Sequence, residues 1–149
     1  GNKVYYGDPS RLDLLRAAGA DKARIMLIAV DNVEASMKTA ELVKRQFPHL
    51  KILARAHDRH HAYLLMDLGI EHVYRETLGS SLELTQSLLC ELGDSPERAG
   101  DTVRRFRDHD EKTLRIQQVI HRDETKLVET ARESAEELRR LFESDPEDL

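Results

Sequence analysis

The run Arg24–Val30, Arg-Ile-Met-Leu-Ile-Ala-Val, is the strongest structural signal in this sequence. It is continuously apolar after its first residue, which is typical of a strand buried on both faces of a parallel sheet. Either Asp31 or Asn32 is suited to cap the helix expected next. Apolar side chains then recur at helical spacing until Pro48 ends the pattern: Val33, Met37, Ala40, Val43 and Phe47.

The same alternation of strand and helix continues downstream. Lys51–Ala56 predicts the next strand, and Asp58 predicts the cap of a helix that stops at Gly69. His72–Tyr74 predicts a short last strand. A further helix is expected at about Ser80–Leu92, with one apolar stripe formed by Leu84, Leu88 and Leu92.

Upstream, Lys3–Tyr6 predicts a short strand. Asp8 is suited to cap a helix that begins at Pro9, where a missing N–H has no cost, and that ends at Gly19. Strand–helix–strand units with short connections form a parallel sheet through right-handed crossovers. The sequence therefore predicts an α/β fold.

In parallel α/β sheets the ligand crevice lies beyond the carboxyl ends of the strands. Polar residues stand at each predicted strand end: Gly7-Asp8, Asp31-Asn32, His57-Asp58 and Arg75-Glu76. For Asp8 and Asp31 two interpretations stay open, capping of a helix and polar contact with a nucleotide. The two roles do not exclude each other.

The charge of the chain is concentrated in its C-terminal third. From Pro96 onward there are 11 Lys and Arg and 15 Asp and Glu in 54 residues. The composition changes near Gly93, which divides the chain into a packed part, 1–93, and a charged helical extension, 94–149. Ser95 and Pro96 are suited to start a helix. Its thin apolar face needs a partner surface, either the domain or a second chain: Ile116, Ile120, Leu127, Ala131, Leu138 and Phe142.

Three further features of the sequence could carry chemistry. His57 and His61 have the i, i+4 spacing of a metal pair on a helix, but no third ligand is placed, so a solvated helix start is favoured over a metal site. Cys90 lies among leucines and is expected to be a buried, inert thiol. Arg104–Arg107 is either a solvated helix face or an anion-binding patch.

Composition and missing motifs exclude several classes of protein. The 149 residues are 40% hydrophobic and 34% charged, with a net charge of −5 and one Cys, which indicates a globular chain without a disulfide framework. No apolar run reaches the roughly 18–20 residues that cross a bilayer. The acidic balance disfavours nucleic acid as a partner. Neither a glycine-rich phosphate loop nor a Ser-His-Asp order is present, so we expect no enzyme and no catalytic residue.

Several spaced motifs resemble one known family. They are Tyr6–Leu15, Phe47–Leu50, Ala54–Asp58, Arg75–Thr77 and Arg104–Asp110. They are similar to the regulator-of-potassium-conductance domain, also called the potassium-transport nucleotide-binding or TrkA-N domain. Within that family the chain is most similar to the cytosolic C-terminal part of Kef-type potassium/proton antiporters.

The resemblance implies a regulatory function at the cytoplasmic face of the bacterial inner membrane. The membrane part of the same protein would exchange potassium for protons. The cytosolic part would dimerise, bind AMP or NAD(H), and hold the transporter closed while glutathione is bound, until glutathione adducts release it. A quinone-oxidoreductase-like ancillary protein is a further implied partner. The alternative is a protein-interaction module without a small ligand, and a nucleotide-dependent oxidoreductase is third.

The resemblance also assigns roles to individual residues. Gly7 and Asp8 match the strand end that meets adenosine, and Asp31 lies at the next strand end near the nucleotide. Arg75 matches an arginine that binds glutathione. Two further assignments concern Arg107, at a position where some members carry an asparagine that touches glutathione, and Asp58, which matches an acidic residue linked to gating. An arginine fork suits the carboxylates of such a ligand.

Compared with the family, this sequence is expected to represent a partial Rossmann-like sheet without its first two strands and without the glycine-rich loop. Three arrangements are open: a fragment of the antiporter, a first strand that pairs directly on Arg24–Val30, or a gap filled by another chain. Because the loop amides anchor the phosphates, we expect AMP binding by this chain to be weak or absent.

Overall fold

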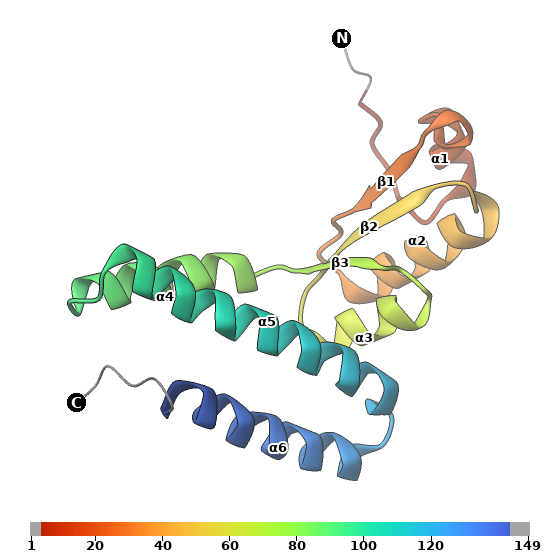
Figure 1. Ribbon diagram of the computed structural model, residues 1–149. Coiled ribbons are helices and arrows are strands. Elements are labelled where there is room, and N and C mark those ends of the chain that lie inside the picture. Colours follow the sequence, from red (N-terminus) through yellow and green to blue (C-terminus); the bar gives the residue numbers. More distant parts are fainter. Residues whose placement is uncertain (1–3, 144–149) are drawn as a thin grey trace. The chain divides into compact units, whose positions relative to one another are not determined.

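The computed structural model describes residues 4–143, and the chain forms two compact units, Gly1–Thr77 and Leu78–Leu149 (Figure 1). The first unit holds a short helix α1 (Leu12–Ala17), a 3-10 turn η1 (Ala20–Lys22), β1 (Ile25–Ile28), α2 (Val33–Gln46), β2 (Lys51–Ala56), α3 (Arg59–Asp67) and β3 (His72–Arg75). The second holds α4 (Leu78–Glu91), α5 (Pro96–Ile120) and α6 (Glu124–Glu143). The predicted composition break near Gly93 lies between α4 and α5.

The three strands form one parallel sheet in the order β1-β2-β3. Leu27 pairs with Leu53, and Leu53 pairs in turn with His72. Each strand is followed by a helix along the chain, so the predicted parallel α/β sheet with a helical C-terminal part is confirmed.

One face of this sheet forms the core of the first unit. Ile28 of β1 and the inward side chains of β2 are buried, Met26 of β1 is half-buried, and Phe47 at the end of α2 is 1% exposed. Helices α2 and α3 contact the strands and cover this face (Figure 1). The buried apolar side chains include Ile28, Ala40, Val43, Ile52, Ala54, Ala56, Ala62 and Leu65.

The opposite face of the sheet is open, which contradicts the prediction that Arg24–Val30 is buried on both sides. Ile25, Leu27 and Tyr74 are 58%, 65% and 60% exposed. The apolar run shortens to the four residues of β1, which is an edge strand of the described sheet. The prediction failed because an apolar run does not show whether a second layer covers its outer face.

Two predictions for the N-terminal segment are also wrong. Residues 4–6 of the expected strand Lys3–Tyr6 are irregular and exposed, and Lys3 lies outside the described residues. The helix expected from Pro9 begins later, as α1, with Arg11 at its N-cap. The Asp8 carboxylate instead accepts hydrogen bonds from the amide and hydroxyl of Ser10, which closes a local turn before the helix.

The second unit is built from three helices, with α5 in contact with both α4 and α6. Ser95 caps α5 through a hydrogen bond from the Arg98 amide, with Pro96 in the first turn, as predicted. The continuous helical face expected after Pro96 is interrupted, because α5 ends at Ile120 and α6 starts at Glu124. The Asp123 carboxylate accepts a hydrogen bond from the Lys126 amide just before α6 begins. The hydrogen bonds from Lys126 lower the pKa of this carboxyl.

A small polar cluster joins α5 to α6. His109 Nε2 lies 3.0 Å from the Ser134 carbonyl oxygen and 2.9 Å from its hydroxyl. Because a carbonyl oxygen only accepts, Nε2 carries the donated proton. The Ser134 hydroxyl also lies 2.8 Å from Thr113 Oγ1. This cluster fixes the register of the two helices. It matters because α6 has no buried side chain of its own.

Candidate functional site

The candidate site is the carboxyl edge of the sheet, where β1, β2 and β3 end side by side. Arg55, near the end of β2, spans this edge. Its Nη2 donates to the Ala29 carbonyl oxygen at 3.1 Å and to the Asp31 carboxylate, both at the end of β1. Its Nη1 lies 3.8 Å from Glu76 Oε1, just after β3. One guanidinium therefore connects all three strand ends.

His57 extends this cluster on the far side of Glu76. Its Nδ1 lies 3.3 Å from Glu76 Oε2, and the Glu76 amide donates to the Ala56 carbonyl, which closes the β2–β3 edge. Arg55 contributes a positive charge to this edge, and Asp31 and Glu76 contribute negative charges. Arg55 is 31% exposed and the Asp31 carboxylate 93% exposed, so a ligand at this edge meets accessible charges of both signs.

Asp31 and Asn32 have separate roles, which settles the choice that the sequence left open. Asn32 Oδ1 accepts from the Ala35 amide and caps α2. Asp31 is thereby left to pair with Arg55. The predicted position of Asp31 at a strand end is confirmed, while its contact with a nucleotide stays a prediction.

His57 and Asp58 connect β2 to α3. Asp58 caps α3 by accepting from the His61 amide at 2.8 Å. His57 lies before the helix rather than on it, and its amide donates to His61 Nδ1 at 3.1 Å. His61 is 1% exposed, so the expected solvated helix start is wrong for this side chain. Among residues 4–143, no group of three or more His, Cys, Asp or Glu side chains could hold a metal ion.

Gly7 and Asp8 precede α1. Gly7 has φ +150°, and a Cβ added there would lie 3.2 Å from Leu14 Cδ2, so the position favours glycine. The hydrogen bonds from Ser10 hold the pKa of the Asp8 carboxyl below its usual value, with smaller contributions from Arg11 and Lys38. Because Lys38 is on α2, Asp8 lies within electrostatic reach of the helix that follows β1.

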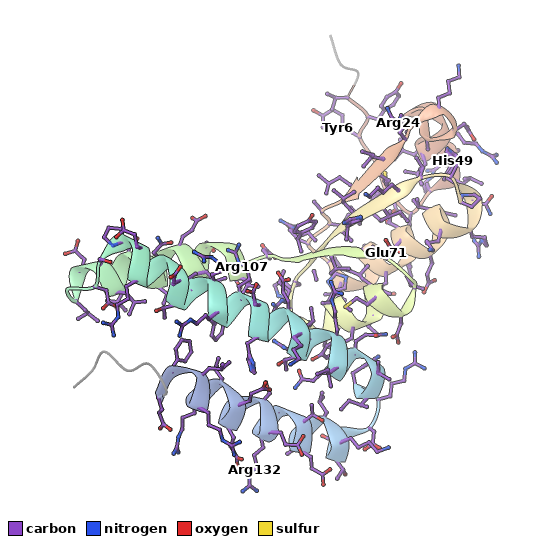
Figure 2. The ribbon with its side chains drawn as sticks, in the orientation of Figure 1. Tyr6, Arg24, His49, Glu71, Arg107 and Arg132 are labelled. Carbon is purple, nitrogen blue, oxygen red and sulfur yellow. The ribbon has the colours of Figure 1, made fainter. Side chains whose placement is uncertain are left out.

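The two arginines expected to bind glutathione lie in different units. Arg75 is the last residue of β3 and pairs in register with Ala56, so it is on the helix-covered face, whereas Arg55 pairs with Tyr74 on the open face. Arg107 is an exposed residue of α5 (Figure 2). In the same basic run, Arg104 pairs with Asp101 at 2.7 Å, which supports a solvated helix face at that position.

Two sequence predictions concern helix α4: its leucine stripe and the burial of Cys90. Leu84 and Leu88 of the predicted stripe are 72% and 55% exposed, and Leu92, the residue after α4, is 76% exposed, whereas Leu82 is 4% exposed and packs inward. Cys90 is a free thiol of intermediate exposure rather than a fully buried one. The helix therefore presents an apolar stripe away from its own unit's core.

Sequence reasoning singled out Asp31 at this edge but assigned no role to Arg55 or Glu76. The signal that could have found Arg55 is its position one residue before the end of β2, as a charged side chain between Ala54 and Ala56. An arginine at that position reaches both neighbouring strand ends only when β2 is the central strand.

Comparison with known proteins agrees with this architecture. Residues 1–76 match the TrkA-N domain, and residues 80–149 match the potassium efflux system KefB C-terminal domain. A solved structure, the Shewanella denitrificans Kef C-terminal domain in AMP-bound form, is 40% identical to this chain with a TM-score of 0.79. The match covers 80% of this chain and 76% of that one.

The fold and these matches define a Rossmann-like regulatory domain of potassium transport. The chain belongs to the family of Kef-type C-terminal domains, as the resemblance of its motifs implied. Within residues 4–143 none of the helices combines the length and apolar character needed to span a membrane.

Proposed function

We propose that this chain is the cytosolic ligand-sensing domain of a glutathione-gated potassium/proton antiporter and has no catalytic residue of its own. The observation that carries the proposal is the 40% identity, over most of the chain, to a Kef C-terminal domain that binds AMP. In this proposal the chain lies at the cytoplasmic face of the bacterial inner membrane, and the membrane part of the same protein carries out transport.

The carboxyl edge contributes the nucleotide-binding part of the proposal. Gly7 and Asp8 face the adenosine of an AMP or NAD(H) ligand, and Asp31 contacts its polar groups from the end of β1. A ribose hydroxyl can donate to a carboxylate as accessible as that of Asp31. Since no glycine-rich loop supplies phosphate-binding amides, the affinity of this chain for AMP is expected to be weak.

Glutathione or its adducts are bound by Arg75 and Arg107 in this proposal, and Asp58 takes part in gating. Glutathione has two carboxylates, and an arginine fork binds a carboxylate through two parallel hydrogen bonds. Asp58 caps α3 directly after the edge cluster, so a ligand that moves this turn also moves the helix.

The test is calorimetric titration of the chain with a glutathione adduct. Arg75→Gln and Arg107→Gln are each expected to weaken binding at least tenfold, because removing one hydrogen-bonded charge costs about 1.5–3 kcal/mol. The exposed Arg16→Gln on α1 is the matched control and should bind like the wild type. Unchanged affinity in Arg75→Gln would exclude the assignment.

The second candidate, an interaction module, is favoured by the exposed stripe on α4. Such a stripe at i, i+4 and i+8 is typical of a helix that packs on another surface. In the antiporter proposal the same stripe serves a homodimer, and the ancillary oxidoreductase-like protein is a further partner. Sedimentation of two α4 variants tests whether the stripe forms a dimer contact. Leu88→Glu should shift a dimer toward monomer, whereas the control variant Glu83→Gln should not.

A further inference from the structure

The buried imidazole of His61 has no role in the function proposed above, although it contacts His57 of the edge cluster. It lies in the first turn of α3, on the face that packs inward, and is 1% exposed. Its Nδ1 accepts a hydrogen bond from the His57 amide at 3.1 Å. Because Nδ1 is an acceptor here, the neutral ring must carry its proton on Nε2.

The other nitrogen of this ring is not satisfied. His61 Nε2 is buried and has no hydrogen-bond partner among the described residues. The hydroxyl of Ser36, on the neighbouring helix α2, is likewise buried and unpartnered within that part of the chain. A buried cation at this position would therefore lack the polar contacts that compensate for lost hydration.

The charged groups around His61 come from three elements. On its own turn and helix, Asp58 favours the protonated ring, and His57 and His60 disfavour it. From β3, Arg75 lies on the face that α3 covers, and Glu76, just after the strand, contacts the ring of His57. The buried side chains of α2 do not titrate: Ser36, Thr39, Ala40 and Val43. Burial is the largest effect and lowers the pKa of His61.

We propose that His61 is a proton-sensitive switch that holds the β2–α3 turn at neutral pH and releases it in acid. Protonation adds a hydrogen to Nδ1, so two donors, the ring N–H and the His57 amide, then face each other. The His57 amide must move away, and the contact of its ring with Glu76 is lost with it. The edge cluster of Asp31, Arg55 and Glu76 is thereby loosened from one side.

The direction of the pH effect follows from linkage. A histidine whose pKa is lower in the folded than in the unfolded chain binds fewer protons when folded. Its contribution to stability is therefore complete above its ordinary pKa of about 6.5 and declines as the pH falls below that value. Because the proposed antiporter admits protons to the cytoplasm, the switch would respond to its transport product. That extension rests on the proposed function, whereas the switch itself does not.

Hydrogen exchange of the His57 amide tests the switch in the ligand-free chain. After correction for the intrinsic pH dependence of exchange, the opening constant should rise from pH 7.5 to 5.5, by at most about tenfold, because an exposed histidine is about 90% protonated at the lower pH. His61→Asn keeps an acceptor near the position of Nδ1 but does not titrate, so its opening constant should stay constant. His60→Asn, at an exposed position of the same helix, keeps the His61 imidazole and should still show a rise of the opening constant in acid.

A second measurement does not depend on any variant. Long-range nitrogen–proton NMR spectra of the wild-type chain at pH 7.5 should show His61 with its proton on Nε2 and an unprotonated Nδ1. A proton on Nδ1 at that pH would overturn the proposal. An equal pH response in the wild type and His61→Asn would overturn it as well. Neither experiment contains nucleotide or glutathione, so failure here is distinct from failure of the proposed function.

Discussion

Replacing Arg55 by glutamine removes the cation that connects the three strand ends. The lost hydrogen bond to the Ala29 carbonyl, a bond from a charged donor, contributes about 1.5–3 kcal/mol. The two ion pairs add about 0–1 kcal/mol each, since the Asp31 and Glu76 carboxylates are 93% and 37% exposed and screened by water. We therefore expect the free energy of unfolding of the first unit to fall by about 1.5–5 kcal/mol.

The assay is urea unfolding followed through the exchange of β1 and β2 amides, which reports the first unit alone. Arg45→Gln, at an exposed position of α2, is the matched control. Arg55→Lys keeps the charge but not the planar fork, so it should recover only part of the loss. If Arg55→Gln changes stability by no more than about 0.5 kcal/mol, the level of an ordinary surface substitution, Arg55 does not organise the edge.

Three further substitutions test the fold. Asn32→Ala removes the cap of α2 and should lower the urea-unfolding free energy by about 1 kcal/mol; Asn32→Asp should restore it, and equal losses in both would exclude a capping role. Ser134→Ala removes the hydroxyl that joins His109 and Thr113 and should destabilise the second unit by about 1 kcal/mol in calorimetry; unchanged melting would show that the cluster is not stabilising. Phe47→Ala opens a cavity in the core and should cost about 3–5 kcal/mol, and a loss near 1 kcal/mol would contradict the packing described for the first unit.

Local signals predicted those parts of the fold that depend on neighbouring residues. The limits of β2 at Lys51 and Ala56 and the caps Asp58 and Ser95 follow from patterns within a few residues. The carboxyl-edge location of the site follows from chain order in parallel sheets. These features require no information about distant segments.

Features that depend on distant segments were missed. Whether the outer face of β1 is exposed depends on whether a second layer covers the sheet. Ile25 and Leu27 are equally apolar with or without that layer, so their identity does not predict their exposure. The bridging by Arg55 requires β2 to be central and the strands to end in register. The break between α5 and α6 carries neither Gly nor Pro, and Asp123, which caps α6, is the local signal that marks it.

The central claim is that this chain senses glutathione for a potassium antiporter, and potassium efflux from cells that express the full transporter tests it most directly. With the wild-type domain, efflux should stay low and rise when an electrophile forms glutathione adducts. With Arg75→Gln, that response should be lost, while Arg16→Gln should leave it intact. An adduct response in Arg75→Gln equal to that of the wild type would contradict the account.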